Sequence, residues 1–220
     1  TPGVKVFDGY YRFDDIDIVV PVGDKNTRLM LLQMGMASEN FKGIRRLFFC
    51  SRSILLPKNL FYAIFYSLWH YFSGMWQVVA IVLCLNLVSV KMALIELTAV
   101  SLVILLFIFS ILLHELGHAV SFRISCHSRS AICVSHGLRC YLVRPRLNFW
   151  REVFVVISGP FAPAVFGLGF AFFAPVSGFI LLAWIALSVG HILCLFFPKG
   201  DGLNFLAAIQ LRSLERSVVD

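Results

Sequence analysis

The sequence predicts an all-α polytopic membrane protein with about four transmembrane helices, a small cytoplasmic β-hairpin loop and a small N-terminal extension. Of its 220 residues, 59% are hydrophobic and only 14% are charged, whereas a soluble domain carries about 25% charged residues. The apolar residues come in long blocks instead of the short amphipathic periods of a soluble core. Almost all of the charge lies outside these blocks, so water is not the main solvent of this chain.

Residues 1–58 form the polar part of the sequence, and we expect a small cytoplasmic extension there. Val4–Phe13 and Ile16–Val22 have the composition of short strands, and Arg28–Leu47 is compatible with a helix. The aromatic-rich stretch Leu60–Phe72, which carries His70, suits a helix at the membrane interface as well as a buried one. Neither an initiator Met nor a signal-peptide pattern opens the chain, so we expect Thr1 to begin a fragment.

Four apolar segments follow, each near the twenty residues needed to cross a hydrocarbon core of about 30 Å. They are Gly74–Val90, Ala93–Phe122, Val153–Ala174 and Ser177–Phe197. The second is unusually long, and it has no ionisable residue between Leu97 and Leu113 before His114 appears. We expect a membrane core over residues 59–202 and an interfacial tail helix over 203–220, with Leu203, Leu206, Ile209 and Leu214 on one side.

The distribution of Lys and Arg predicts the orientation in the membrane, because short cytoplasmic loops are enriched in these residues. Basic residues gather before the first span, between the second and third spans, and after the fourth, whereas the other two connections hold only Lys91. Both ends and the long loop are therefore predicted to be cytoplasmic. The net charge of +7 is accounted for by these flanks, and we expect no binding to nucleic acid.

A metal-binding motif lies inside the second span, at His114-Glu115-Leu116-Gly117-His118. Two His at i and i+4 lie on one helix face, where both imidazoles can reach one ion. With only six His in the chain, such a match is rare by chance. Unpaired ionisable residues are costly inside a span and normally mark function. In a zinc hydrolase of this kind, the Glu beside the first His takes the proton of the attacking water.

Two His leave such a site incomplete, because catalytic zinc usually takes three protein ligands. The acidic residues in or bordering the spans are Glu96, Glu115, Glu152 and Asp201. Only Glu152 and Asp201 lie on the predicted cytoplasmic side with the motif. Asp201 belongs to Phe197–Gly202, where one Pro and two Gly break the helix and allow a side chain to turn back into the bundle. His191 is the alternative ligand, or a hydrogen-bonding partner of a ligand.

These motifs together resemble the site-2 protease family of intramembrane zinc metalloproteases. The resemblance covers roughly Ala93–Gly202 and rests on three matching segments: the HELGH motif, Ser158-Gly159-Pro160, and the Pro198 to Gly202 segment that contains Asp201. It implies that the zinc ligands are His114, His118 and Asp201 and that the catalytic base is Glu115. Within this framework we assign substrate binding to His191, Gly159 and Pro198.

The chain departs from the family pattern at two positions. The family usually has Asn three residues before the proline of the last motif, where this chain has Leu195, and often Asn after the middle Gly-Pro, where this chain has Pro163. Neither Asn would be a ligand, so these differences concern the holding of a substrate strand more than zinc binding. We expect His191 to take over part of this polar role.

The loop between the second and third spans contains a predicted hairpin. Ala131–Val143 reads as two strands around a His136-Gly137 turn, a register in which Cys133 faces Cys140. Its edge would suit an extended substrate peptide. The Cys and His residues of this loop could instead form a second zinc site, although their spacing matches no standard zinc finger. The simpler interpretation is that these cysteines are reduced cytoplasmic thiols. The residues concerned are Cys126, His127, Cys133, His136 and Cys140.

We therefore predict a multi-pass membrane enzyme, a Zn²⁺-dependent intramembrane endopeptidase with its active site toward the cytoplasmic side. Its partners would be the lipid bilayer and a membrane-anchored protein or peptide substrate. The alternative is a non-catalytic membrane protein that keeps the fold and the metal for binding or scaffolding. Glu115 favours the enzyme, because a carrier has no need of a carboxylate beside a bound water.

The orientation is open to a direct test by cysteine labelling in intact cells. A single cysteine placed at Arg144 should be protected from an impermeant maleimide until the membrane is permeabilised, and one at Lys91 should react at once. Immediate labelling at Arg144 would overturn the predicted topology.

Overall fold

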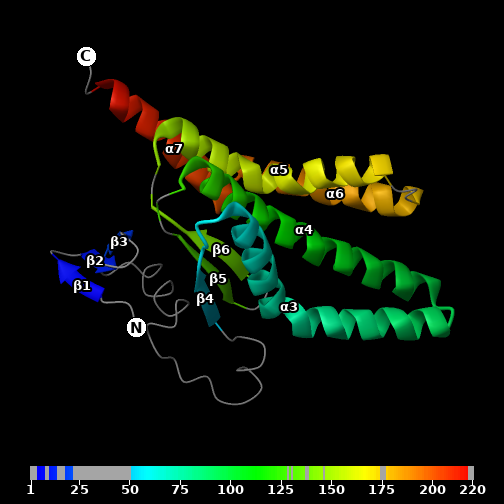
Figure 1. Cartoon of the computed structure of the whole chain (residues 1–220). Coiled ribbons are helices and arrows are strands. Elements are labelled where there is room, and N and C mark those ends of the chain that lie inside the picture. Colours follow the sequence, from blue (N-terminus) through cyan, green and yellow to red (C-terminus); the bar gives the residue numbers. More distant parts are fainter. Residues whose placement is uncertain are drawn as a thin grey trace. The chain divides into compact units, whose positions relative to one another are not determined.

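The structure is a computed structural model, and it describes residues 4–7, 10–13, 18–21, 51–127, 129, 131–136, 139–145, 147–173 and 177–217. The helix expected over Arg28–Leu47 lies outside these residues. Figure 1 shows the elements in chain order. The helices dominate the described chain, which confirms the predicted all-α membrane fold.

The chain divides into two compact units. The first comprises Thr1–Gln77 and Cys126–Arg146, and the second comprises Val78–Ser125 and Leu147–Asp220. The predicted boundaries at residues 58 and 202 followed composition, whereas this division follows contacts between residues distant in the sequence.

Among the residues that the structure describes, four helices are long and apolar enough to cross a membrane. They are α3 (Leu60–Lys91), α4 (Ile95–Ser125), α5 (Phe149–Phe173) and α6 (Gly178–Leu193), the last extended by the 3-10 turn η1 (Cys194–Phe196). All four predicted spans are thus present as helices, and the apolar surface they expose fits a protein embedded in a membrane.

The first span differs from the prediction because Leu60–Phe72 is not a separate helix. It is the beginning of α3, which has 32 residues. At the expected break, the Ser73 hydroxyl donates a hydrogen bond to the His70 carbonyl at 2.8 Å. The serine is therefore satisfied within the helix, and the helical hydrogen bonding continues through this position.

The described residues of the first unit form two three-stranded antiparallel sheets. One has the order β1 (Val4–Phe7), β2 (Tyr10–Phe13), β3 (Ile18–Pro21), so the first predicted strand is in fact two. The other has the order β4, β5, β6 and includes the predicted hairpin. Its strands are β4 (Ser51–Leu55), β5 (Ile132–His136) and β6 (Arg139–Val143).

The register of the hairpin corrects the prediction that Cys133 faces Cys140. The last pair before the turn is His136 and Arg139, so the turn lies one residue later in the sequence than predicted. As a result, each residue of β5 pairs with a residue two positions further along β6 than predicted. Cys133 therefore pairs with Leu142. On its other side β5 pairs with β4, a strand that the sequence analysis did not predict.

In the second unit, α4, α5 and α6 pack on one another, and α7 (Asp201–Ser217) packs against α5 (Figure 1). The α4–α5 contact is very close. A Cβ atom on Gly117 would lie 2.5 Å from the Ser158 carbonyl oxygen. Small residues allow such an approach between membrane helices, which lack a hydrophobic drive to associate.

A polar cluster ties the end of α3 to the start of α4. The Asn86 side chain donates hydrogen bonds to the Ser101 hydroxyl at 2.7 Å and to the Thr98 carbonyl at 3.4 Å, and Thr98 donates to the Ser89 hydroxyl at 2.9 Å. Ser89 and Ser101 are fully buried. In an apolar solvent these groups must satisfy each other, so the cluster holds the two helices together.

The cluster predicts a stability effect for Asn86→Ala. Loss of two interhelical hydrogen bonds should lower the free energy of unfolding by about 0.5–2 kcal/mol, the range for such bonds in membranes. Unfolding of the purified protein in a detergent titration would measure it. Leu85→Ala, at a neighbouring lipid-facing position with 42% exposure, is the control, and equal destabilisation by both variants would contradict the assignment.

Candidate metal centre

Two buried imidazoles form the base of the site. His114 and His118 follow each other by one turn of α4, with exposed fractions of 8% and 9%. Their Nε2 atoms lie 3.3 Å apart. The spacing predicted that both would share one helix face, and this is confirmed.

Asp201 reaches the same point from the turn that follows α6. The helix ends in η1, Phe197 is extended before Pro198, and Gly200 takes the left-handed conformation at φ 55°. Asp201 then begins α7. A Cβ atom on Gly202 would lie 1.8 Å from the Phe197 carbonyl oxygen, so the tight turn requires glycine there. The predicted break of the helix is confirmed, and it places the carboxylate beside the histidines.

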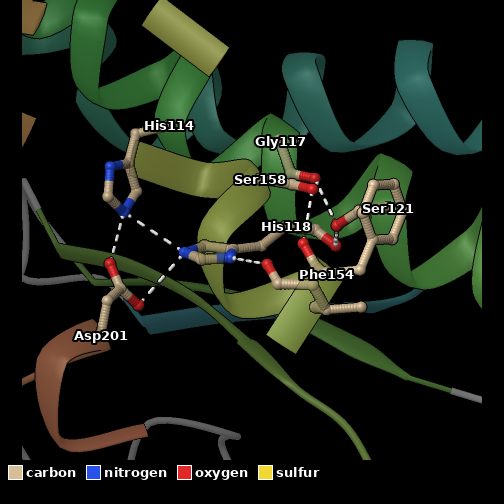
Figure 2. Close-up of polar contacts among 8 residues, drawn as sticks. His114, Gly117, His118, Ser121, Phe154, Ser158 and Asp201 are labelled. Carbon is tan, nitrogen blue, oxygen red and sulfur yellow. Dashed lines mark hydrogen bonds and ion pairs between the residues drawn. The ribbon is translucent and has the colours of Figure 1, made fainter. Parts of the chain in front are cut away.

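The three side chains converge on one point (Figure 2). Asp201 Oδ2 lies 2.8 Å from His114 Nε2, and Asp201 Oδ1 lies 3.2 Å from His118 Nε2. One ligand atom of each residue lies within 4.8 Å of the other two. Within the described part of the chain, this is the one group of His, Cys, Asp and Glu side chains placed so that it could hold a metal ion.

The ring of His118 is oriented by α5. Its Nδ1 donates a hydrogen bond to the Val155 carbonyl at 2.8 Å. A neutral imidazole bound this way carries a lone pair on Nε2, which points at Asp201 and at His114. A lone pair facing a carboxylate is repulsive unless a cation or proton lies between them. The arrangement therefore fits a metal ion, and a backbone carbonyl on the far nitrogen is the usual support of a ligating histidine.

Gly159 makes this orientation possible. A Cβ atom there would lie 2.2 Å from His118 Nε2 and 2.3 Å from Cε1. Any side chain would push the ring from its position. We had assigned Gly159 to substrate binding, and the structure places it against the ligand ring itself.

Asp201 is well suited to ligation at neutral pH. Burial raises the pKa of its carboxyl group, but the adjacent imidazoles of His114 and His118 lower it more, so that the pKa lies below its ordinary value. The group is therefore an anion, and it completes a set of two imidazoles and one carboxylate. Zn²⁺ is commonly held by such a set.

Glu115 lies next to the group without belonging to it. It follows His114 on α4 and is partly buried, and its carboxylate is not among the three converging side chains.

The other predicted site residues lie around the group. His191 packs its ring against that of His114, with centroids 4.8 Å apart. The single proton of the Ser110 hydroxyl goes to the Phe107 carbonyl at 2.8 Å, so Ser110 Oγ accepts a hydrogen bond from His191 Nε2 at 3.0 Å. His191 is thus engaged with Ser110 and is not among the grouped ligands. Pro198 is exposed in the turn before Asp201.

The rival carboxylate, Glu152, is used elsewhere. Its Oε2 accepts a hydrogen bond from the Leu147 backbone N–H at 2.9 Å, at the beginning of α5. Sequence reasoning missed three contributors to the site: the Val155 carbonyl, Ser110 and the packing role of Gly159. Only the glycine left a signal in the sequence, because it stands one turn after Val155 in a helix where glycine is unfavourable.

Comparisons with known proteins add no assignment: neither a family model, nor a curated protein, nor a solved structure matches this chain.

The role of Gly159 predicts that Gly159→Ala reduces metal affinity. The new Cβ would displace the His118 ring from Asp201, and we expect a loss of about tenfold or more, as for other groups that orient metal ligands. Zn²⁺ binding to the purified protein in detergent would measure it. Gly169→Ala is the matched control, because a Cβ on this glycine of the same helix meets nothing within 4 Å; equal affinities in the two variants would contradict the proposed packing role.

Proposed function

We propose that this protein is a zinc-dependent intramembrane endopeptidase that cleaves membrane-associated proteins or peptides. The observation that carries the proposal is the convergence of His114, His118 and Asp201 within 4.8 Å, with Glu115 adjacent on the same helix. The resemblance of these segments to site-2 proteases agrees with it. So does the choice of ligands, because imidazole and carboxylate are common zinc donors.

The position of the group supports work on membrane substrates. His114 and His118 lie within α4, a candidate membrane span. Asp201 follows the last span and begins α7. The group therefore joins residues within a candidate span to a residue that follows the last one. We place it toward the cytoplasmic side because the Lys and Arg residues gather in the adjoining loops.

The chemistry divides among the residues. Zn²⁺, when bound, acts as a Lewis acid toward the peptide carbonyl and makes water more acidic. His118 is held in the ligating tautomer by the Val155 carbonyl. Glu115 accepts a proton from water as the water oxygen bonds to the carbonyl carbon, and it returns a proton to the amine nitrogen as the peptide bond breaks. The products are one peptide with a new carboxyl group and one with a new amino group.

A Glu115→Gln variant distinguishes an enzyme from a metal-binding scaffold. Glutamine keeps the size of the side chain and cannot accept the proton, so cleavage of a model transmembrane substrate should slow by about 10²–10⁴ while bound zinc is unchanged. Glu96→Gln is the matched control, since it makes the same change in the exposed first turn of α4. Cleavage by Glu115→Gln at the wild-type rate would favour the non-catalytic alternative.

Asp201→Ala tests the third ligand. Two imidazoles remain in this variant, so both zinc content and cleavage should fall together. Asn204→Ala, at an exposed position of the same helix, should retain both. If His191→Ala loses the metal and Asp201→Ala keeps it, then His191 is the third ligand and the resemblance fails at that position.

A further inference from the structure

A pocket of about 290 Å³ lies between α4, α5 and α6, away from the metal group. Its walls include Leu106 and Phe109 of α4, Phe166 and Phe170 of α5, and Trp184 of α6. The one polar side-chain atom of its lining, Trp184 Nε1, donates a hydrogen bond to the Pro163 carbonyl at 3.0 Å. The pocket therefore offers nothing to a charged or hydrogen-bonding group, and its ligand must be apolar.

The walls of this pocket are preformed by aromatic packing. The ring centroid of Phe109 lies 5.4 Å from that of Phe166 and 5.9 Å from that of Trp184. Gly167 allows Trp184 to lie against the α5 backbone, because a Cβ there would be 1.9 Å from Trp184 Nε1. Such contacts fix the shape of the cavity. A fixed shape discriminates between ligands of defined structure, whereas a fluid lipid tail gains little from it.

The pocket is displaced from the metal group in the same direction on all three helices. On α4, Phe109 of the pocket precedes His114 of the metal group by five residues. On α6, Trp184 of the pocket precedes His191, which packs on His114, by seven residues. The helix α5 runs in the opposite direction, and there Gly167 beside the pocket follows Gly159 beside His118 by eight residues. At 1.5 Å per residue these offsets are about 8–12 Å along the bundle. An extended peptide covers this distance in about three residues. The shift is toward the end where α5 and α6 are joined, and thus farther into the membrane.

We propose that this pocket binds one bulky apolar side chain of the peptide substrate, about three or four residues from the cleaved bond. The inference rests on the proposed peptidase function and names its substrate class: membrane segments with a large apolar residue at that position. The size of the cavity agrees, because 290 Å³ lies at the low end of ligand pockets and suits one side chain. The side chain would belong to the part of the substrate that continues into the membrane.

The test uses the full-length, zinc-loaded protein in liposomes. A model transmembrane peptide carries Ala at positions two to five from the cleaved bond, and Phe is placed at each position in turn. We expect kcat/KM to rise at least tenfold at one position, three or four residues away. Ala171 lines the pocket, so Ala171→Phe should fill it and abolish this preference. Gly169→Phe adds the same bulk to α5 where a Cβ meets nothing within 4 Å, and it should keep the preference.

A second variant and a second readout guard against loss of the fold. Leu181→Ala enlarges the pocket and should shift the preference from Phe toward Trp, with zinc content unchanged. The second readout does not depend on cleavage and uses the Glu115→Gln protein. A peptide with benzoylphenylalanine at the preferred position should crosslink to pocket residues such as Phe109 and Phe166.

The outcomes separate the two proposals. Cleavage with no positional preference, or with the same preference in Ala171→Phe, overturns the pocket assignment and leaves the peptidase intact. Absence of cleavage together with crosslinking into the pocket overturns the peptidase and leaves the peptide site. If a photoreactive phospholipid labels the pocket and the peptide does not displace it, the occupant is lipid and the inference is wrong.

Discussion

The close approach of α4 to α5 is the contact on which the rest of the site depends. Gly117 leaves no room for a side chain below the Ser158 carbonyl, and Gly159 leaves none beside the ring of His118. Membrane helices associate through packing more than through the hydrophobic effect, so small residues at the contact determine how near they come. Here the separation brings the Val155 carbonyl within 2.8 Å of His118 Nδ1, and that bond directs the other nitrogen to the metal group.

An apolar solvent explains why several polar groups of this unit pair with one another. Water cannot reach a buried hydroxyl or imidazole inside a bilayer, so each must find its partner in the protein. Asn86, Thr98 and Ser101 satisfy one another between α3 and α4. His191 and Ser110 do so between α6 and α4. The group of His114, His118 and Asp201 differs from these sets because it could also hold a metal ion, which is the physical reason to regard it as a candidate functional site.

Much of the fold was predictable because membrane spans are encoded locally. Twenty apolar residues in a row leave few alternatives to a helix in lipid, and all four predicted spans are helices. The sheet was harder. Nothing in the five residues of β4 indicates a partner some eighty residues later. In the hairpin, an error of one residue in the predicted turn displaced every predicted cross-strand pair by two residues. Pairing depends on the neighbouring strand, which no single segment encodes.

The sequence by itself determined the chemistry of the site. The i, i+4 spacing placed His114 and His118 on one face, and the Pro and Gly residues before Asp201 predicted that the chain would turn there. Only the tertiary structure decided how these parts lie together. Asp201 contacts both imidazoles, Glu152 accepts a hydrogen bond from the Leu147 backbone, and Gly159 leaves room for the ring of His118. The reason is that ligand type and helical spacing are local properties, whereas convergence depends on how closely separate helices pack.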